Sequence, residues 1–511
     1  MKIALINPPW YSPVPDKFTA ANLGLSYLTS WLRHKGHEVV PIDALFELPN
    51  YPVQSVQVSF KYQKVFRVGV SYEHIAAQIP NDTDFIGIAA PFSNHKCILQ
   101  ELSVLLKKTH PHTKILIGGP YPSTSPDEQK ELPHVDFGFN GEAEIAIEQL
   151  LTGKSCEDIK GLIWWNNGEL KVNGRTEVIV DLDTIPFPAR EVFHCNEILD
   201  RQEAARIRNG VDIIEKKARG VPIITSRGCP YDCKFCSIHF MNGYRWRYRS
   251  PRNVVDEMIE LKEKYNVEEI AILDDHLNGN RERLLKILDL MIAERVDLKW
   301  QLPNGIRVDY LDKELMQKMK EAGCNSLVLG VQHGSQHMVE KMNTRLDLKK
   351  VETIANIGKE LGLNMAAFLI VAYPGETLKI FKESLSFCMR IGRKYGINDW
   401  RINVARAYPN THLYNDCVKN NWFYRDPSEL LYFPGDPTEA NITCPEFTPK
   451  EALRRRDYAK RKLMSVENPF YWTFVYYVEW LGLKQVAQKI LPDKLWFAAK
   501  KTLFGLSFPS Q

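Results

Sequence analysis

No stretch of this sequence is long and apolar enough to cross a bilayer, and no secretory signal opens it. A membrane-spanning helix needs about 18 or more consecutive apolar residues, and no run in the chain approaches that length. The N-terminus, MKIALINPPW, lacks the basic, apolar and small-residue regions of a signal peptide. We therefore expect a cytoplasmic protein.

An excess of charge of one sign is also lacking. The 66 lysines and arginines nearly balance the 62 aspartates and glutamates, which leaves a formal net charge of +4. This balance gives no reason to expect a nucleic-acid partner, although small phosphate-bearing ligands stay open. The ten cysteines are scattered along the chain, which is typical of a reducing compartment and not of a disulfide scaffold.

Alternating strand and helix signals fill residues 1–150. KIALINPP, EVVPIDA, DFIGIAA, KILIGG and VDFGFNG have the pattern of strands, and amphipathic stretches such as LGLSYLTSWLRH lie between them. The order predicts a doubly wound, Rossmann-like parallel sheet of the α/β class, which binds ligands beyond the carboxyl ends of its strands. The residues at those ends include Asn7, Pro8, Ser93, Gly118, Gly119, Gly141 and Glu142.

Three further segments follow. Residues 151–215 are predicted to be a linker with a hairpin, because GLIWWNNGELKV has a turn sequence at Asn167–Gly168 and DLDTIPFPAR is broken by prolines. Over 216–435, six strand signals separated by helical stretches predict a partial (β/α)6 barrel of the TIM type. Residues 436–511 are predicted to be mostly helical, with a basic stretch, ALRRRDYAKRKLM, ahead of an aromatic one, FYWTFVYYVEW.

Three cysteines stand close together after the first strand of the predicted barrel, in TSRGCPYDCKFCSIH. Cys229, Cys233 and Cys236 form a C-x3-C-x2-C array. An odd number of thiols cannot pair among themselves. A structural zinc site takes four protein ligands, whereas a catalytic one takes three and a water, so the triplet alone does not decide. A cubane iron–sulfur cluster normally takes four thiolates, so three would leave one iron open to a further ligand.

This stretch resembles the hallmark of the radical S-adenosylmethionine (SAM) superfamily, in which an aromatic residue, here Phe235, precedes the last cysteine. The resemblance extends over about residues 216–390. It implies a [4Fe-4S] cluster on the three cysteines, an open iron that binds SAM, and one-electron cleavage of SAM to methionine and a 5′-deoxyadenosyl radical.

Two downstream stretches extend the resemblance. ILDDHLNGNRER resembles the second-strand motif, which implies that Asp274 and Asp275 lie near the methionyl amine of SAM, although both also suit the cap of the next helix. LGVQHGSQH resembles the fourth-strand GxESG stretch, with Gln332 at the glutamate and His333 at the serine. We expect Gln332 to bond the ribose or the methionyl group of SAM.

A third stretch, FLIVAYPGET, resembles the fifth-strand block of the superfamily, with Ala372 in place of a glycine. Its Pro374, Gly375 and Glu376 predict a turn and a helix cap.

The first 150 residues and DLDTIPFPAR resemble the cobalamin-binding domain and linker that precede many radical SAM enzymes. The D-x-H-x-x-G motif through which some such domains ligate cobalt is absent, and we expect the nearest histidine, His95, to be an ordinary loop residue. Cobalamin is therefore expected without a histidine ligand. The resemblance places it at the strand-end residues Asn7, Pro8, Ser93, Gly118, Gly119, Gly141 and Glu142.

Together the resemblances imply a class B radical SAM methyltransferase with flavodoxin or ferredoxin as electron donor. It would methylate an unactivated carbon, or a phosphinate phosphorus, of a small molecule such as a lipid or natural-product intermediate. The residues expected to line its active site are Tyr231, His239, His276 and His333. The aromatic tail favours a helix packed on the barrel. An amphipathic element at the inner face of the membrane, which would suit a lipid-like substrate, stays an alternative.

Two other functions stay open. A radical SAM cyclase, oxidative ring-former or C–C coupling enzyme would release 5′-deoxyadenosine without S-adenosylhomocysteine. A non-enzymatic cobalamin or metal carrier or sensor would hold zinc on its cysteines.

Overall fold

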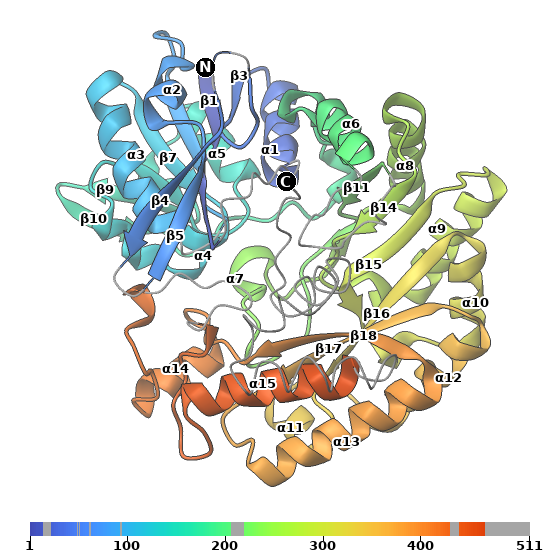
Figure 1. Ribbon diagram of the computed structural model, residues 1–511. Coiled ribbons are helices and arrows are strands. Elements are labelled where there is room, and N and C mark those ends of the chain that lie inside the picture. Colours follow the sequence, from blue (N-terminus) through green and yellow to red (C-terminus); the bar gives the residue numbers. More distant parts are fainter. Residues whose placement is uncertain are drawn as a thin grey trace, which may run out of the picture.

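Two α/β units lie side by side in a computed structural model of the chain (Figure 1). The structure describes residues 1–13, 22–48, 50, 52–60, 63–91, 95–205, 219–429 and 439–464. Ser93 and the aromatic tail beyond residue 464, both singled out in the sequence, lie outside the described residues.

The N-terminal unit is built on a seven-stranded sheet in the order β10-β9-β8-β7-β6-β1-β3. Five neighbouring strands of this sheet, β8, β7, β6, β1 and β3, run parallel, as the sequence predicts for a doubly wound fold. The strands of this sheet are β1 (Lys2–Asn7), β3 (Glu38–Asp43), β6 (Phe85–Ala89), β7 (Lys114–Gly118), β8 (Phe137–Phe139), β9 (Leu162–Asn166) and β10 (Glu169–Val172). The helices of the unit are α1 (Leu23–His34), α2 (Tyr72–Ala77), α3 (Lys96–Thr109), α4 (Pro120–Thr124) and α5 (Glu144–Leu151).

The hairpin predicted at Asn167–Gly168 is present. Both turn residues have left-handed φ angles, 49° and 83°, which a type I′ turn requires. The hairpin does not stand apart in a linker, however, because β9 pairs antiparallel with β8. It therefore extends the N-terminal sheet to Val172, beyond the boundary at residue 150 expected from the sequence.

A second, three-stranded sheet in the N-terminal unit was not predicted. Its order is β2-β5-β4, from β2 (Trp10–Ser12), β4 (Gln54–Phe60) and β5 (Gln63–Gly69). The alternation of apolar and polar residues in QSVQVSF and QKVFRVG is the signal that could have revealed β4 and β5.

The second unit is an open, all-parallel sheet of six strands in the order β11-β14-β15-β16-β17-β18, which confirms the partial barrel. These strands are β11 (Gly220–Ile223), β14 (Glu269–Ile272), β15 (Lys299–Ile306), β16 (Cys324–Gln332), β17 (Asn364–Val371) and β18 (Ile397–Val404). A short ribbon, β12 (Ser226–Arg227) with β13 (Arg247–Tyr248), follows β11. The helices are α6 (Cys195–Ala205), α7 (His239–Asn242), α8 (Pro251–Tyr265), α9 (Arg281–Ala293), α10 (Lys313–Glu321), α11 (Gln336–Lys341), α12 (Leu348–Glu360), α13 (Leu378–Tyr395), α14 (His412–Lys419) and α15 (Pro449–Met464).

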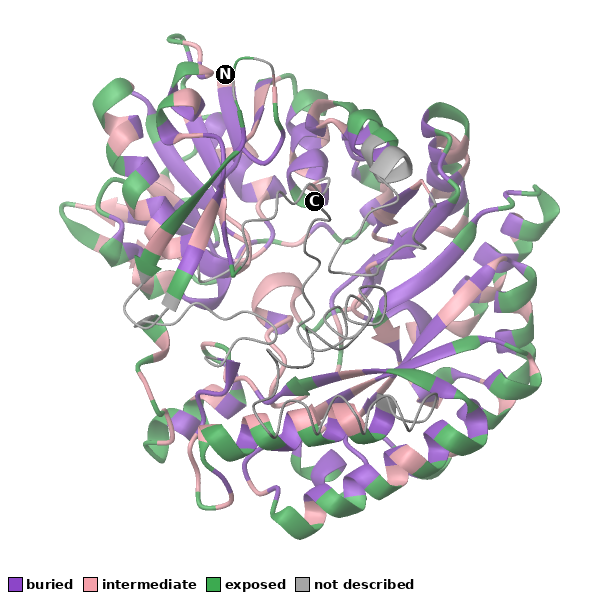
Figure 2. Ribbon diagram, in the orientation of Figure 1, coloured by how far each residue is buried: buried purple, intermediate pink, exposed green. Residues whose placement is uncertain are grey.

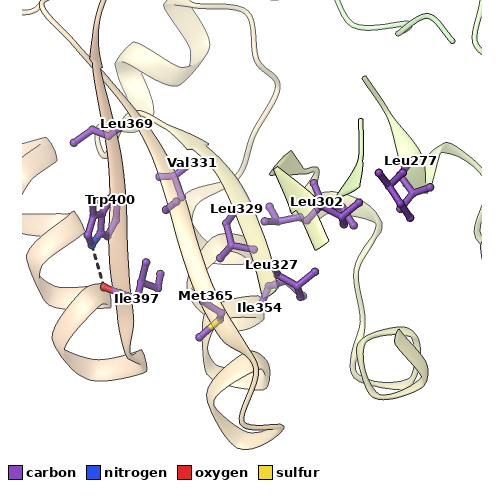
Figure 3. Packing of buried hydrophobic residues seen from close by; sticks show 14 of the residues in the cluster. Leu277, Leu302, Leu327, Leu329, Val331, Ile354, Met365, Leu369, Ile397 and Trp400 are labelled. Atoms are coloured by element: carbon purple, nitrogen blue, oxygen red, sulfur yellow. Dashed lines mark hydrogen bonds between the residues drawn. The ribbon is translucent and has the colours of Figure 1, made fainter. Parts of the chain in front are cut away.

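The barrel core lies between its strands and the helices outside them. Buried residues dominate the strands and the inward faces of the helices, whereas the outward faces are exposed (Figure 2). Leu327, Leu329 and Val331 are fully buried at alternate positions of β16, so they project from one face of the strand. Trp400 on β18 closes this layer and donates from its indole nitrogen to the carbonyl of Ile397 at 3.1 Å (Figure 3).

The last described helix, α15, packs against β18 and α13. Its Arg455 pairs with the buried Glu376 at 3.1 Å. Within the described residues, no helix has the length and apolar character needed to span a membrane.

Candidate functional site

The three clustered cysteines lie in the loop between β12 and α7. Backbone hydrogen bonds anchor this loop to two other elements: Lys234 donates to Met342 at the end of α11, and Leu413 of α14 donates to Lys234. Within the loop, the amide of Cys236 donates to the carbonyl of Cys233 at 2.9 Å. All three thiols are free and half-buried.

The electrostatics of this loop favour a cationic partner for the thiols. Burial, and then the charges of Cys236 and Cys229 against that of Arg307, raise the pKa of Cys233 to about 12. Burial likewise raises the pKa of Cys236 to about 11, with Cys229 adding to the effect. Three neighbouring thiolates are stable only when a metal centre neutralises them, and an iron–sulfur cluster is held by this donor set. Among the described residues, no group of three or more His, Cys, Asp and Glu is arranged to hold a metal ion directly.

Aromatic and basic side chains surround the cysteine loop. The hydroxyl of Tyr231 lies 2.5 Å from that of Tyr310, and the guanidinium of Arg307 lies 3.5 Å from the centre of the Tyr231 ring. The ring of His276 meets Tyr231 edge-on, with centroids 5.5 Å apart. Burial, and then the charge of Arg307, lower the pKa of His276 to about 4, so this imidazole is neutral at physiological pH. The structure thus brings Tyr231 and His276 together beside the cysteines.

The other two predicted histidines have different surroundings. His239 is buried in α7 and stacks on Tyr244 with centroids 3.8 Å apart, and neither ring nitrogen has a hydrogen-bond partner among the described residues. His333 is fully buried and lies 3.2 Å from Glu376, while the amide of Ser335 donates to its other ring nitrogen. The structure therefore places His333 in a buried network under α15.

The helix-cap predictions were wrong. Glu376 does not cap α13: its carboxylate accepts from the amide of Ala372 at 2.6 Å and pairs with Arg455, and Thr377 is the cap. Neither Asp274 nor Asp275 caps α9, because that role belongs to Asn280.

Of the residues predicted to bind SAM, Asp274 forms hydrogen bonds within the protein. Its carboxylate accepts from the amide and hydroxyl of Thr225 and the hydroxyl of Ser226, each at 2.6 Å, so it joins the end of β11 to β14. Gln332 is half-buried at the end of β16 with a φ of 61°, and Phe235 packs against the barrel core.

A cavity of about 670 Å³ lies between the two units. The N-terminal unit lines it at the carboxyl ends of its strands. The barrel lines it with the segment from β11 through β12, the loop after β14, Asn304 of β15, and α7. Among the predicted cobalamin residues, the structure brings Gly118, Gly119, Gly141 and Glu142 to its wall.

The remaining predicted residues lie elsewhere. Asn7 and Pro8 do not line the cavity, and neither does His95, which is buried just before α3. The amide of Asn7 instead donates to Asp43 at 2.8 Å, and its carbonyl oxygen accepts from Asn22 at 3.0 Å. Asn22 caps α1 and itself lines the cavity, so Asn7 supports the wall from behind.

The N-terminal wall of the cavity suits a large flat group. It is mainly apolar, with residues such as Leu25, Leu116 and Phe139, and it contains several glycines. A Cβ added to Gly24 or Gly118 would meet only one neighbouring atom, at 3.6 and 3.8 Å, so either side chain would project into the cavity. These glycines keep open a cradle that a corrin could occupy.

Glu142 has a role that its position in the sequence did not indicate. Its carboxylate accepts from Arg227 at 3.0 Å and from both terminal nitrogens of Arg247, and all three side chains are buried. Arg227 also donates to Glu144 at 2.8 Å. Glu142 is therefore committed to a charge bridge between the two units. Sequence reasoning missed Glu144 and both arginines because the partners are more than 80 residues apart and no local pattern marks them.

Two family models match the chain: "B12 binding domain" over residues 16–151 and "Radical SAM superfamily" over residues 223–388. An uncharacterised methyltransferase of Pyrococcus horikoshii is 27% identical over 429 residues, which cover 82% of this chain and 84% of that protein. The cytidylyl-2-hydroxyethylphosphonate methyltransferase of Streptomyces wedmorensis is 24% identical over 443 residues, 80% of each protein.

Solved structures share the fold, among them those of TsrM and OxsB. TsrM, a radical SAM methyltransferase from Kitasatospora setae solved with cobalamin and a [4Fe-4S] cluster, has a TM-score of 0.63 at 18% identity, covering 83% of this chain and 79% of its own. OxsB, a cobalamin-dependent SAM radical enzyme, has a TM-score of 0.62 at 18% identity over 82% of this chain and 55% of its own. The two domains thus imply cobalamin, a [4Fe-4S] cluster and SAM as the cofactors. The chain is a radical SAM protein with an N-terminal B12-binding domain, and the proteins similar to it include methyltransferases.

Proposed function

We propose that the chain transfers a methyl group to an unactivated carbon of a small molecule, using a [4Fe-4S] cluster, SAM and cobalamin bound without a histidine ligand. One observation carries the proposal: the cysteine loop and the interdomain cavity share a wall. Arg227, which lines the cavity, stands two residues before Cys229, and Asn242, which also lines it, ends the helix after Cys236. A cluster on the loop and a corrin in the cavity would therefore be neighbours.

The residues of the chain divide the work of binding. Cys229, Cys233 and Cys236 would hold the cluster, and Phe235, Asp274 and Gln332 stay candidates for contacts with SAM. Gly24, Gly118, Gly119 and Gly141 would let the corrin approach the backbone. When bound, these cofactors supply the radical that removes a substrate hydrogen and the methyl group that replaces it.

The chain itself positions these groups and excludes water. Arg227 and Glu142 fix the cysteine loop against the cavity wall, and the apolar side of the cavity keeps water from it. Tyr231 and His276 would face the substrate from the barrel mouth, where His276 can give or accept a hydrogen bond as a neutral imidazole. A flavodoxin or ferredoxin would supply electrons to the cluster.

The products formed from SAM test this proposal. Reconstituted protein is incubated anaerobically with SAM, a reductant and a probe substrate, beginning with cytidylyl-2-hydroxyethylphosphonate and tryptophan, which the names of two similar proteins supply. Methyl transfer requires S-adenosylhomocysteine together with 5′-deoxyadenosine. Release of 5′-deoxyadenosine alone, with a cyclised or coupled product, would favour the radical cyclase or coupling enzyme instead. Stoichiometric zinc without iron would favour the carrier or sensor.

The lipid-like substrate and the membrane contact depended on the aromatic tail. That tail lies outside the described residues, so the proposed substrate is a small molecule and no membrane contact is proposed.

A further inference from the structure

Asp275 differs from the other polar residues on the barrel side of the cavity. It follows β14, lines the cavity, and accepts a hydrogen bond from the side-chain amide of Asn242 at 2.8 Å. Among the described residues, no lysine, arginine or histidine forms an ion pair with it. A carboxylate has room for about four hydrogen bonds, so Asp275 keeps acceptor capacity toward the cavity.

The neighbouring polar groups of the barrel wall are committed. The hydroxyl of Ser226 donates to Asp274 at 2.6 Å, and the amide of Asn304 donates to the carbonyl of Leu273 at 2.8 Å. Arg227 is neutralised by the carboxylates across the domain boundary. Asp275 is therefore the ionisable residue of this wall that lacks a partner of opposite charge within the described part of the chain.

Asp275 also lies close to the cysteine loop. Behind burial, its charge contributes to the raised pKa of the Cys229 and Cys236 thiols. Its carboxylate thus stands between the cluster loop and the cavity. Burial, and then the charges of Asp274 and Glu142, raise the pKa of Asp275 to about 6 against the opposing hydrogen bonds from the side chain of Asn242 and the amide of Gly228. Asp275 is therefore mostly ionised at pH 7 and above.

A partly buried carboxylate without a cation favours a ligand that is positively charged and donates a hydrogen bond. Both SAM and an aquacobalamin meet this description. The lining of the cavity favours cobalamin over SAM. Four of the residues predicted to bind cobalamin line it, whereas the other candidates for SAM, Phe235, Asp274 and Gln332, do not.

We propose that Asp275 is the residue that faces cobalamin from the barrel side and accepts a hydrogen bond from the axial water of the cobalt. The inference rests on the proposed cobalamin site. It assigns Asp275 to cobalamin instead of to the methionyl amine of SAM, and it makes Asn242 the residue that positions the carboxylate.

The test uses the full chain with its cluster reconstituted and with aquacobalamin as the probe. The change from aquacobalamin to hydroxocobalamin is followed by absorbance from pH 7 to 11, where Asp275 is ionised. A nearby anion stabilises the bound water against loss of its proton. We therefore expect Asp275→Asn to lower the midpoint of the transition by about one pH unit or more, a tenfold change in proton affinity, while Asp275→Glu retains part of the effect.

Glu144→Gln is the matched control, because it removes one charge from the lining of the same cavity, on the side of the N-terminal unit, at a residue already paired with Arg227. Its shift should be less than half of that for Asp275→Asn. Cobalamin content and SAM affinity are measured for every variant. If Asp275→Asn retains no cobalamin, Asp275→Glu carries the comparison with the wild type.

The outcomes separate the two proposals. A wild type that holds cobalamin, with the same midpoint in Asp275→Asn, overturns the assignment of Asp275 alone. Equal shifts in Asp275→Asn and Glu144→Gln overturn it as well, because a general field would explain both. Loss of SAM binding with an unchanged midpoint returns Asp275 to SAM. A wild type that retains no cobalamin overturns the proposed function, and this inference with it.

Discussion

Arg227 of the barrel donates a 3.0 Å hydrogen bond to Glu142 of the N-terminal unit, and both side chains are buried. The same guanidinium nitrogen reaches Glu144 at 2.8 Å. Because Arg227 stands two residues before Cys229, this bridge connects the position of the cysteine loop to the wall of the cavity. The geometry between the two proposed cofactor sites is thus set by ionic contacts across a domain boundary.

Removing the cation of this bridge should destabilise the folded chain. In Arg227→Met, Glu142 retains Arg247, but Glu144 becomes a buried carboxylate without its ion-pair partner. Breaking one side of a buried pair costs about 3 kcal/mol of the free energy of unfolding, which urea denaturation at pH 7 would measure. Arg252→Met, which removes exposed pairs with Asp256 and Glu294, is the control and should change stability little. Equal losses in the two variants would contradict the bridge.

The three clustered cysteines should control iron content without controlling cobalamin content. Each of Cys229→Ala, Cys233→Ala and Cys236→Ala is expected to lose most of the iron and sulfide bound after anaerobic reconstitution, because a cubane held by two thiolates is unstable. Cobalt, measured in the same samples, should stay near the wild-type level. Cys156→Ser, at a half-buried cysteine far from the loop in sequence, should keep its iron. Stoichiometric zinc in the wild type would instead identify a different metal site.

Filling the glycine cradle should exclude cobalamin while the fold persists. A side chain at Gly118 would project into the cavity, since a Cβ there meets only Phe139 at 3.8 Å. We expect Gly118→Val to reduce cobalamin retention at least about tenfold, equivalent to 1.4 kcal/mol of binding free energy, as measured by absorbance after gel filtration. Gly118→Ala should have a smaller effect. Normal cobalamin binding by the valine variant would place the cofactor elsewhere.

His276 should make the folded state sensitive to mild acid. Burial, and then Arg307, lower its pKa to about 4, whereas an unfolded histidine titrates near about 6.5. Between pH 7 and 5 the unfolded state therefore binds a proton that the folded state does not. The free energy of unfolding thus decreases as the pH is lowered from 7 to 5. His276→Gln should remove about 2 kcal/mol of this loss, as obtained from unfolding free energies at the two pH values. The same change at the exposed His112 should not reduce the loss, and an unchanged loss in His276→Gln would show that the imidazole titrates normally.

Local patterns predicted the strands and helices well because each depends on a short stretch of sequence. The six barrel strands, the parallel sheet and the turn at Asn167–Gly168 follow from apolar runs and turn residues. The attachment of that hairpin to β8 did not follow, because strand pairing across the chain leaves no local trace.

The candidate site likewise has parts that the sequence predicts and parts that depend on tertiary contacts. The cysteine array is contiguous, and the glycines at strand ends follow from the topology of the sheet. The capping predictions for Asp274 and Glu376 failed because these carboxylates bind residues distant in sequence. Asp274 accepts a hydrogen bond from Thr225, and Glu376 forms an ion pair with Arg455.

The packing of α15 on β18 has a consequence for any fragment of this chain. The radical SAM match ends at residue 388, before the last strand of the barrel. A fragment cut at that point would lose β18 and its covering helix, leaving the backbone donors and acceptors of β17 without a neighbour. Such an exposed strand edge invites pairing between molecules. The region after the family match, at least to Met464, thus covers a strand edge that would otherwise be open to such pairing.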